Sequence, residues 1–332
     1  DLNGRTITVQ AGPTGLPDIG IDIQDTARPL IHDTTATPGE LVIEDGTAIQ
    51  ALRSTSAEIS GFGLRFDPAS SGDVGVALDD SVGLTIRGVS GDDQGTDNTG
   101  IGGSGATDVT VEDVDWTAQN GGIRSSFLGL SSGFGSFVIR NASANESNVF
   151  ADSDGLDVDN LLADYATDPD PSTPSVEFRG GGQVLNYQQT GGSFRSAGSP
   201  GNTIFYNRPT FFGFRRNVQF GDGLNVDGPY LRRGPGSQDR FIRLIGTSGT
   251  TIITNAVLAK ATTDMTEILI DSDPGASATW NTSVAFQAFD PTTEAPVGQV
   301  DYIQDTITFG RLTANVGFRY DNTVVSPGEL AA

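Results

Sequence analysis

The chain has 332 residues, of which 44 are Gly and 36% are apolar, and it carries a formal net charge of −23 with no cysteine. That charge repels phosphate backbones and anionic lipid head groups, so nucleic acid and an anionic membrane surface are poor partners. The lack of cysteine excludes disulfides and Cys-based zinc sites, and no apolar run is long enough for a transmembrane helix. Abundant Thr, Val, Gly, Asn and Asp predict an all-β protein of short strands and tight turns.

The charge is spread along the whole chain, mostly as Asp, and Lys260 is the only lysine among 19 basic residues. In molar salt the Debye length falls to about 3 Å, which removes most of the self-repulsion of such a chain. This composition resembles that of haloarchaeal proteins and of the viruses that infect haloarchaea. The resemblance implies a high-salt environment.

Residues 1–56 are predicted to be an N-terminal cap with short first coils. The segment Leu41-Val-Ile43-Glu-Asp45 has the apolar-x-apolar pattern of a short inward-facing strand. No basic and apolar leader is visible before it, which indicates either that the start is processed or trimmed or that export does not use a cleaved signal. His32 is the only histidine, and we expect it to be structural or exposed because a Ser/His/Asp triad needs its histidine beside a nucleophile.

Residues 57–260 repeat one five-residue pattern, apolar-x-apolar-x followed by Gly, Asn or Asp. Period-two alternation points the apolar residues inward, and the fifth residue tolerates the left-handed backbone that a corner requires. The repeats recur every 19 to 28 residues, a spacing that suits three short strands and three turns per coil. Their central residues are Ile59, Ile86, Val111, Ile139, Val158, Phe178, Phe205, Val226 and Ile253.

This pattern predicts a parallel solenoid, and an antiparallel β-sandwich is the alternative. A sandwich should show hairpin signals every 8–12 residues, whereas only Asp45-Gly46 and Asn120-Gly121 suggest such turns. Residues 261–332 keep strand-like pieces while the corner rule weakens. They are predicted to be either further coils or a C-terminal cap or assembly module.

The coils resemble the right-handed parallel β-helix superfamily that contains pectate lyases, polygalacturonases and the tailspikes or fibres of tailed viruses. The resemblance covers roughly residues 40–260 and is one of architecture. It implies an all-β, right-handed parallel β-helix with terminal capping segments. The Asn-Thr-Asp, Gly-His-Gly and Arg-x-Lys signatures of the polygalacturonase-like enzymes are missing.

Two acidic stretches are candidates for carboxylate-pair catalysis, because glycosidases in general use two carboxyl groups. One contains Asp92, Asp93 and Asp97, and the other contains Asp152, Asp154, Asp157 and Asp159. With 42 acidic residues in the chain, solvated surface loops are the alternative. No cofactor is expected, except that Asp152, Asp154 and Asp157 are candidate ligands of a structural Ca²⁺.

A third stretch concentrates aromatic and basic residues in a chain that otherwise avoids basic charge. Such side chains are typical of subunit interfaces and ligand grooves, although alternate positions must face the core. The candidates are Tyr206, Arg208, Phe212, Phe214, Arg215, Arg216, Tyr230, Arg232 and Arg233. Asn141, Asn145 and Asn281 match the glycosylation acceptor pattern, and Asn141 also occupies a predicted corner.

Together these features predict a structural and host-recognition protein of a halophilic archaeal virus, located at the virion surface or outside the cell. It would be a homotrimeric tail fibre, tailspike or capsid turret that contacts other virion proteins and a host surface glycan or S-layer. A secreted polysaccharide lyase or glycoside hydrolase and a haloarchaeal cell-surface adhesion protein are the alternatives. Neither nucleic acid binding nor membrane insertion is expected.

Overall fold

The computed structural model describes most of the chain up to residue 314. The described residues are 4–10, 18–35, 38–119, 126–166, 173–214, 218–233, 240–245, 250–261, 269–272, 277–280, 284–290, 292–293, 296–303, 307–308 and 313–314. Over these ranges the helices and strands comprise β-strands alone, which confirms the all-β prediction. Within the described ranges, no helix exists that is long and apolar enough to span a membrane.

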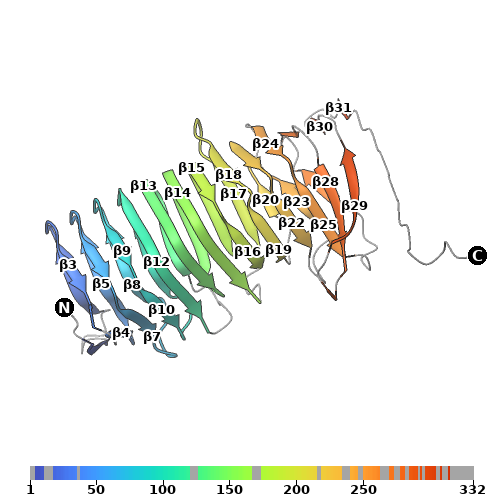
Figure 1. Ribbon diagram of the computed structural model, residues 1–332. Helices are drawn as coiled ribbons and strands as arrows, with labels where there is room; N and C mark the ends of the chain where they lie inside the picture. The colour runs from blue at the N-terminus through green and yellow to red at the C-terminus, as the bar shows by residue number, and fades with distance from the viewer. Residues whose placement is uncertain are drawn as a thin grey trace, which may run out of the picture.

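The strands wind into a parallel β-helix whose coils stack along one axis, from β3 (Leu30–His32) at one end to β28 (Val284–Phe289) at the other (Figure 1). Within the coils from β1 to β28, strands pair in parallel with the corresponding strands one coil before and one coil after, as β6 does with β3 and β9. The solenoid prediction is therefore confirmed, and the antiparallel sandwich is excluded for these coils. Three walls surround the core, and we number them in chain order.

Wall 1 begins each coil. Its strands are β1 (Thr6–Val9), β4 (Glu40–Ile43), β7 (Gly63–Phe66), β10 (Ser90–Asp93), the last parts of β12 (Val109–Ala118), β13 (Ser126–Asn145) and β14 (Asn148–Tyr165), then β16 (Gln188–Gly191), β19 (Thr210–Phe214), β22 (Tyr230–Arg233), β25 (Val257–Ala261) and β28.

Wall 2 follows after a turn. Its strands are β2 (Asp18–Gln24), β5 (Gly46–Leu52), β8 (Val74–Asp79), β11 (Thr99–Ser104), the first parts of β13, β14 and β15 (Val176–Leu185), then β17 (Phe194–Gly198), β20 (Val218–Phe220), β23 (Arg240–Leu244) and β26 (Leu269–Ser272).

Wall 3 completes the coil. Its strands are β3, β6 (Glu58–Ser60), β9 (Thr85–Arg87), the first part of β12, the middle parts of β13 and β14, the last part of β15, then β18 (Ile204–Asn207), β21 (Leu224–Asp227), β24 (Thr250–Thr254) and β27 (Ser277–Trp280).

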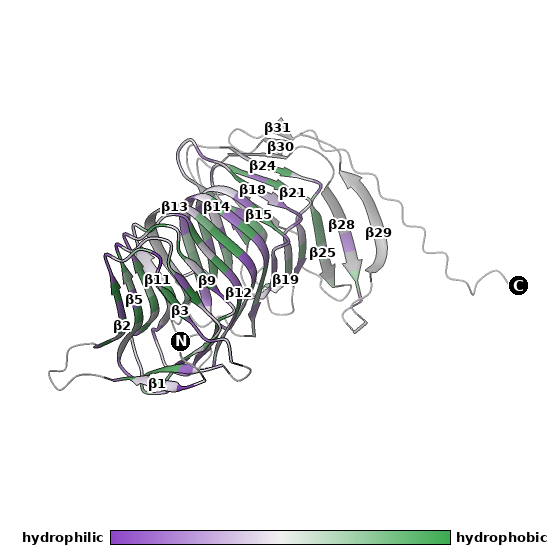
Figure 2. Cartoon of the chain, turned by 60° about the vertical axis from the view of Figure 1, so that its left-hand side comes forward, coloured by the Kyte–Doolittle hydropathy of each residue, from purple (hydrophilic) through white to green (hydrophobic). Residues whose placement is uncertain are grey.

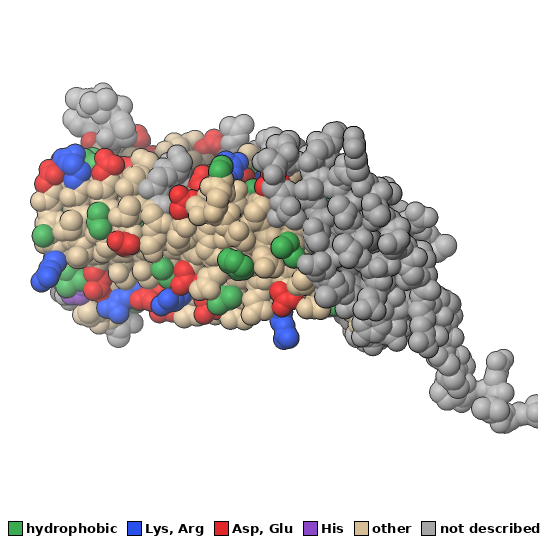
Figure 3. All heavy atoms as spheres, turned by 90° about the horizontal axis from the view of Figure 1, so that it is seen from above, with side chains coloured by type: hydrophobic (Ala, Val, Ile, Leu, Met, Phe, Trp, Pro, Cys, Tyr) green, Lys and Arg blue, Asp and Glu red, His purple; other side chains and the backbone are tan. Residues whose placement is uncertain are grey.

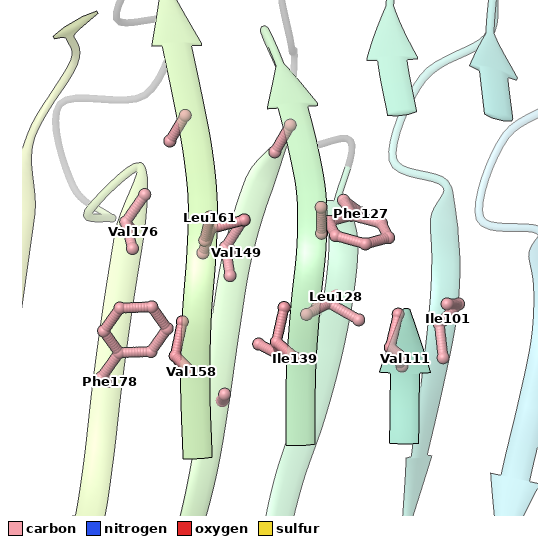
Figure 4. Packing of buried hydrophobic residues seen from close by; sticks show 14 of the residues in the cluster. Ile101, Val111, Phe127, Leu128, Ile139, Val149, Val158, Leu161, Val176 and Phe178 are labelled. Atoms are coloured by element: carbon pink, nitrogen blue, oxygen red, sulfur yellow. The ribbon is translucent and has the colours of Figure 1, made fainter. Parts of the chain in front are cut away.

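Wall 3 contains the predicted repeat. Its inner column runs in register through Ile31, Ile59, Ile86, Val111, Ile139, Val158, Val184, Tyr206, Val226 and Ile253. Seven of the nine predicted central residues therefore stack one above another. Figure 4 shows three of them, Val111, Ile139 and Val158, on successive strands with their side chains in the interior.

Two predicted positions in that column were wrong. Phe178 is buried, but it lies on wall 2 above Ala151, and Val184 takes the place in wall 3. Phe205 is shifted by one residue, because Tyr206 faces inward and Phe205 is 54% exposed on the outer face. The two errors have different causes. Alternation does not say to which wall an inward-facing strand belongs, which misplaced Phe178. In a run of three apolar residues it does not say which residue faces inward, which shifted Phe205 by one position.

The predicted corners after wall 3 adopt the left-handed backbone. Gly61, Gly88, Asp113, Asn141, Asn160, Gly228 and Asn255 all have positive φ, between 49° and 78°. Gly180 also has positive φ, but it follows the wall 2 part of β15, and the corner after β18 is Arg208 rather than Asn207. The residue type at each corner thus follows from the backbone that the turn imposes.

The interior is a continuous hydrophobic column enclosed by the walls. Along the strands, hydrophobic and hydrophilic residues alternate (Figure 2). Burial is complete in the middle coils, where Ile59, Ile86 and Val111 are 0% exposed. Each such side chain contributes roughly 1.5–3 kcal/mol on burial. In the first coil Ile7 is 38% exposed, whereas Leu41, its partner one coil later, is 0% exposed.

The first 56 residues contain coils of the same kind, because β1, β2 and β3 pair with β4, β5 and β6. At the other end β26, β27 and β28 continue the coiling. There β29 (Pro296–Ile303) pairs antiparallel with β28, and β30 (Ile307–Thr308) pairs antiparallel with both β27 and β31 (Thr313–Ala314). The segment after residue 260 therefore combines coils with strands that reverse direction. The division into cap, helix and assembly module stays a prediction.

Candidate functional site

The outer surface of the helix carries the polar groups. In the face shown in Figure 3, acidic and basic side chains lie mainly along the two long edges, and hydrophobic side chains stand singly between them. A binding site on this surface therefore requires that charged and polar side chains from several coils lie next to one another on one wall.

One groove on the outer face of wall 2 meets this criterion. It has a volume of about 510 Å³, and its charged and amide side chains are Glu177, Arg179, Arg195, Gln219, Asp222 and Arg243. They come from β15, β17, β20, β23 and the turn after β20. Small residues (Ala197, Gly198 and Gly221) line it between these side chains and leave room for a ligand.

Strand register explains why these residues meet. Glu177, Arg195, Gln219 and Arg243 are direct neighbours in one outer column of wall 2. Each step along the column is about 4.8 Å, the spacing of hydrogen-bonded strands. Polar side chains from four successive coils therefore form a single row that is parallel to the helix axis.

Glu177 is the centre of this row, with only 7% of its surface exposed. Its carboxylate oxygen Oε1 lies 2.7 Å from Arg179 Nε and 3.7 Å from Arg195 Nε. The guanidinium of Arg179 also lies over the Phe150 ring, 5.3 Å from its centre. A buried carboxylate that pairs with two guanidinium groups fixes their positions, while both Arg side chains stay more than 40% exposed.

The local charge of the groove differs from that of the chain. Three guanidinium groups (Arg179, Arg195, Arg243) face two carboxylates (Glu177, Asp222), so the groove is positive by one charge in a protein of net charge −23. Guanidinium forks bind carboxylates, sulfates and phosphates through two parallel hydrogen bonds. The arrangement can thus hold an anionic group.

This groove was not predicted from the sequence. Glu177, Arg195 and Arg243 did not stand out, because they are 18 and 48 residues apart along the chain. One signal was present. An apolar residue followed directly by Arg occurs in two strands of wall 2, as Phe194-Arg195 in β17 and as Ile242-Arg243 in β23. Only the correct strand register assigns these arginines to one column.

The predicted aromatic and basic cluster divides between the core and the surface. Tyr206, Phe214 and Arg233 are 2%, 1% and 7% exposed, so they do not form a contact surface, contrary to the expectation. Burial raises the pKa of Tyr206, whose hydroxyl donates a hydrogen bond to Ser196 Oγ at 2.6 Å. Arg208 is exposed at its corner. Arg215 and Arg216 lie outside the described residues.

The remaining members form an outer cluster on wall 1, which we call the aromatic platform: Phe212, Tyr230 and Arg232. The rings of Phe212 and Tyr230 are 5.8 Å apart and tilted by 60°. The guanidinium of Arg232 lies 4.8 Å from the centre of the Phe212 ring and 5.4 Å from that of Phe289. All three members are partly exposed, so the platform is a second surface suited to a ligand or a subunit contact.

The acidic candidates in the second stretch do not form one site. Asp152 is on wall 2 opposite Arg179, whereas Asp157 and Asp159 are on the outer face of wall 3. Asp157 accepts a hydrogen bond from Gln183 and Asp159 accepts one from Asn186, so they link successive coils.

Asp154 accepts hydrogen bonds from Ser199 Oγ and Asn202 Nδ2, at 2.8 and 2.9 Å. In the described part of the chain no three acidic or histidine side chains converge as metal ligands. The expected calcium set of Asp152, Asp154 and Asp157 is therefore not assembled.

The first acidic stretch divides in the same way. Asp92 faces outward and accepts hydrogen bonds from Gln94 and Gln119. Asp93 faces inward and is 1% exposed, and Asp97 occupies a left-handed turn position with φ 58°. The three carboxylates therefore do not share one surface.

The other candidates lie on strands and corners. His32 is partly exposed on β3. Asn141 Nδ2 donates to Asp113 Oδ1 at 3.1 Å, and Asn141 Oδ1 accepts from Asn160 Nδ2 at 3.0 Å, which gives Asn141 a structural role at its corner. Asn145 is exposed at the end of β13, and Asn281 lies outside the described residues.

Comparisons with known proteins add little. No family model matches the chain, and no curated protein matches it. Among solved structures, the chain is similar to a hyperthermoactive exopolygalacturonase from Thermotoga maritima, with 10% identity and a TM-score of 0.32 over 87% of this chain and 86% of the other. At that level the similarity carries no argument about activity.

Proposed function

We propose that this parallel β-helix is a glycan-binding protein whose groove on wall 2 recognises sugars that carry carboxylate or sulfate groups. The observation that carries the proposal is one groove lined by three guanidinium groups: the buried Glu177 holds those of Arg179 and Arg195, and Arg243 lies two strands beyond Arg195. A rigid wall that fixes guanidinium groups in advance lowers the entropic cost of binding.

The overall charge limits the conditions under which this groove works. At low ionic strength the net charge of −23 repels any polyanion over tens of ångströms. In molar salt that repulsion is confined to about 3 Å, while bidentate hydrogen bonds within the groove persist. The groove and the high-salt environment expected from the composition are therefore mutually consistent.

Binding measurements in molar KCl test the proposal. Oligogalacturonate and sulfated dextran should bind, neutral dextran should not, and Arg195→Gln or Arg243→Gln should each weaken binding about tenfold, since a hydrogen bond to a charged group is worth roughly 1.5–3 kcal/mol. Arg53→Gln is the matched control, because Arg53 pairs with Asp25 at a corner far from the groove. Equal binding of neutral dextran would contradict the proposal.

The finer role that we propose is display of this groove on a virion of a halophilic archaeal virus, as a homotrimeric tail fibre, tailspike or capsid turret. Support comes from a stiff elongated scaffold, from a chain with one lysine and 42 acidic residues, and from the exposed aromatic platform as a subunit contact. The host surface glycan or S-layer would be the ligand. A cell-surface adhesion protein of the archaeon is the alternative with the same chemistry.

Two measurements test this role. Light scattering in molar KCl should give about three times the 34.6 kDa of one chain, and Phe212→Ser should dissociate the trimer while Phe205→Ser, an exposed ring on wall 3, should not. Mass spectrometry of purified virions should detect the chain. A monomer, or its absence from the particles, would leave only the glycan-binding proposal.

Polysaccharide cleavage is the second candidate, favoured by two carboxylates, Glu177 and Asp222, in the same groove. Glycosidases act through a carboxylate pair. Incubation with acidic and neutral glycans in molar KCl should then release reducing ends, and Glu177→Gln and Asp222→Asn should each abolish the release. Binding without any release of sugar would exclude this candidate.

A further inference from the structure

A buried acidic pair lies at the turn between walls 1 and 2, on different coils from the groove. Asp93 ends β10 on wall 1, and Asp73 directly precedes β8 on wall 2, one coil earlier. They are 1% and 5% exposed. Burying an ionised carboxylate costs several kcal/mol unless a positive partner compensates for it. Each of these two carboxylates therefore requires hydrogen-bond donors or a cation close to its oxygens.

One oxygen of each carboxylate is satisfied. Asp93 Oδ1 accepts hydrogen bonds from the backbone N–H of Gly95 and from Asn98 Nδ2, both at 2.9 Å. Asp73 Oδ1 accepts one from the backbone N–H of Gly46 at 2.7 Å. These hydrogen bonds fix the orientation of both carboxylates.

Asn98 joins the pair into one unit. It is fully buried, its amide oxygen accepts the backbone N–H of Asp73 at 3.0 Å, and its amide nitrogen donates to Asp93 and also to Ser70 Oγ at 2.9 Å. Asn98 therefore links the backbone of Asp73 to the carboxylate of Asp93 and places the two residues next to each other at this turn. Ser70, at 2% exposure, brings a hydroxyl oxygen to the same place.

The second oxygens, Asp73 Oδ2 and Asp93 Oδ2, are buried and accept no hydrogen bond from any described residue. No Lys or Arg neutralises either carboxylate among the ion pairs of the described part of the chain. Burial raises the pKa of Asp73, and the negative charges of Asp45 and Asp93 act in the same direction. The turn thus presents oxygens and negative charge with no matching cation.

We propose that a divalent cation of the Ca²⁺ class binds in this turn between Asp73 Oδ2 and Asp93 Oδ2. Ca²⁺ accepts carboxylate, amide, hydroxyl and backbone oxygens together in flexible geometry, and the turn offers the first three kinds from Asp73, Asp93, Asn98 and Ser70. The ion would bind two successive coils to each other. This site is separate from the predicted set of Asp152, Asp154 and Asp157.

Terbium luminescence tests the site in the intact chain, with Tb³⁺ as the probe and Ca²⁺ as the competitor. Trp116 packs against Gly91 and Gly100, two residues from Asp93 and Asn98 respectively, so it can sensitise an ion bound in the turn. Excitation of tryptophan should produce terbium emission that Ca²⁺ suppresses. Asp93→Asn should weaken binding roughly tenfold or more by removing one ligand charge, whereas Asp92→Asn, its outward-facing neighbour, should not.

Thermal unfolding of the wild-type chain tests the site without any substitution, so its result does not depend on whether a variant folds. The melting temperature of the wild-type chain should rise with Ca²⁺ at constant ionic strength and fall on addition of a chelator, because a ligand of the native state stabilises it. The alternative partner is a proton on Asp73, whose pKa is raised by burial. A melting temperature indifferent to Ca²⁺, with no terbium signal and with Asp73→Asn more stable than wild type at neutral pH, would overturn the proposal in favour of the proton.

Discussion

Trp116 is the largest fully buried side chain of the interior, and glycines make room for it. A Cβ atom at Gly91 would lie 1.9 Å from its ring, and one at Gly100 would lie 2.6 Å away. Its neighbours on wall 1 are Gly91 in the coil before and Ala144 in the coil after. A large residue between small ones keeps the core dense without strain.

We therefore predict that Gly91→Ala destabilises the protein by about 1–3 kcal/mol, the usual cost of overpacking. Gly91→Ala combined with Trp116→Phe should lose less than the sum of the two single substitutions, because the smaller ring vacates the space that the methyl group needs. Urea unfolding of the four proteins in this cycle measures the coupling. Additive losses would mean that the two residues do not share one packing volume.

Asp33 is the most strongly hydrogen-bonded carboxylate near the N-terminus. It accepts hydrogen bonds of 2.6–2.8 Å from the hydroxyl and the backbone N–H of Thr35 and from the backbone N–H groups of Gly4 and Gly39. These bonds, that of the Thr35 hydroxyl first, hold the pKa of Asp33 well below its usual value. The ionised group thereby ties three pieces of the first two coils together.

The depressed pKa of Asp33 determines the direction of its pH dependence. Its contribution to stability is present above the unfolded pKa of about 3.9, and it is lost as the pH falls below about 4 towards the lower folded pKa. Asp33→Asn should lower the melting temperature at pH 6, and the difference from wild type should shrink as the pH falls. The exposed Asp164→Asn is the control. A constant difference down to pH 2 would be the contrary result.

At the scale of strands and corners, the asparagines after wall 3 have two separable roles. Asn160 has φ 61° and donates to Asn141 Oδ1 in the next corner. Asn160→Gly keeps the left-handed backbone and loses the hydrogen bond, whereas Asn160→Ala loses both, so Ala should be less stable than Gly by about 1 kcal/mol. Asn145→Ala, outside a left-handed position, is the control for thermal unfolding. Equal stability of the Ala and Gly variants would show that the corner imposes no backbone strain.

These corners also explain how far the sequence predicts the fold. Left-handed residues and period-two alternation recur in every coil, so Ile59, Ile86 and Val111 could be stacked correctly from the sequence alone. The same alternation marks all three walls, and coil lengths vary, so Phe178 was assigned to the wrong wall. Phe205 was shifted because Ile204, Phe205 and Tyr206 are all apolar, and nothing in such a run says which residue faces inward.

The groove could not be predicted for a related reason. Its residues are outer-face residues, which obey no repeat, and they become neighbours only when each coil has its correct length. Glu177 and Arg195 meet across one short coil of 18 residues, which the predicted spacing of 19 to 28 residues did not include. The predicted acidic and aromatic candidates were chosen by local density along the chain. Local density marks a surface patch only if alternate residues face the same way, and Tyr206 and Phe214 face the core.

On the scale of the whole molecule, charge and shape act together. Each coil lengthens the molecule but leaves its cross-section unchanged. A solenoid therefore has more surface per residue than a sphere and distributes its charge along the axis. Ion pairs between neighbouring coils, such as Arg87 with Glu58 at 2.6 Å and Arg65 with Glu40 at 3.2 Å, offset only part of the charge. Nineteen basic residues cannot balance 42 acidic ones, so the excess negative charge must cause repulsion between coils in dilute buffer.

We therefore predict that the melting temperature rises steadily as KCl is raised from millimolar to molar concentration. Salt shortens the Debye length from about 30 Å at 0.01 M to about 3 Å at 1 M, which removes repulsion between coils that the folded state concentrates and the unfolded chain dilutes. The ion pairs between coils weaken at the same time, but exposed pairs contribute only about 0–1 kcal/mol each, so the net effect should be stabilising. Sucrose at equal osmolality is the control for solvent exclusion, and it should stabilise much less. A melting temperature that falls with KCl would mean that the ion pairs stabilise the fold more than the net charge destabilises it. The interpretation of this composition as a salt adaptation would then be wrong.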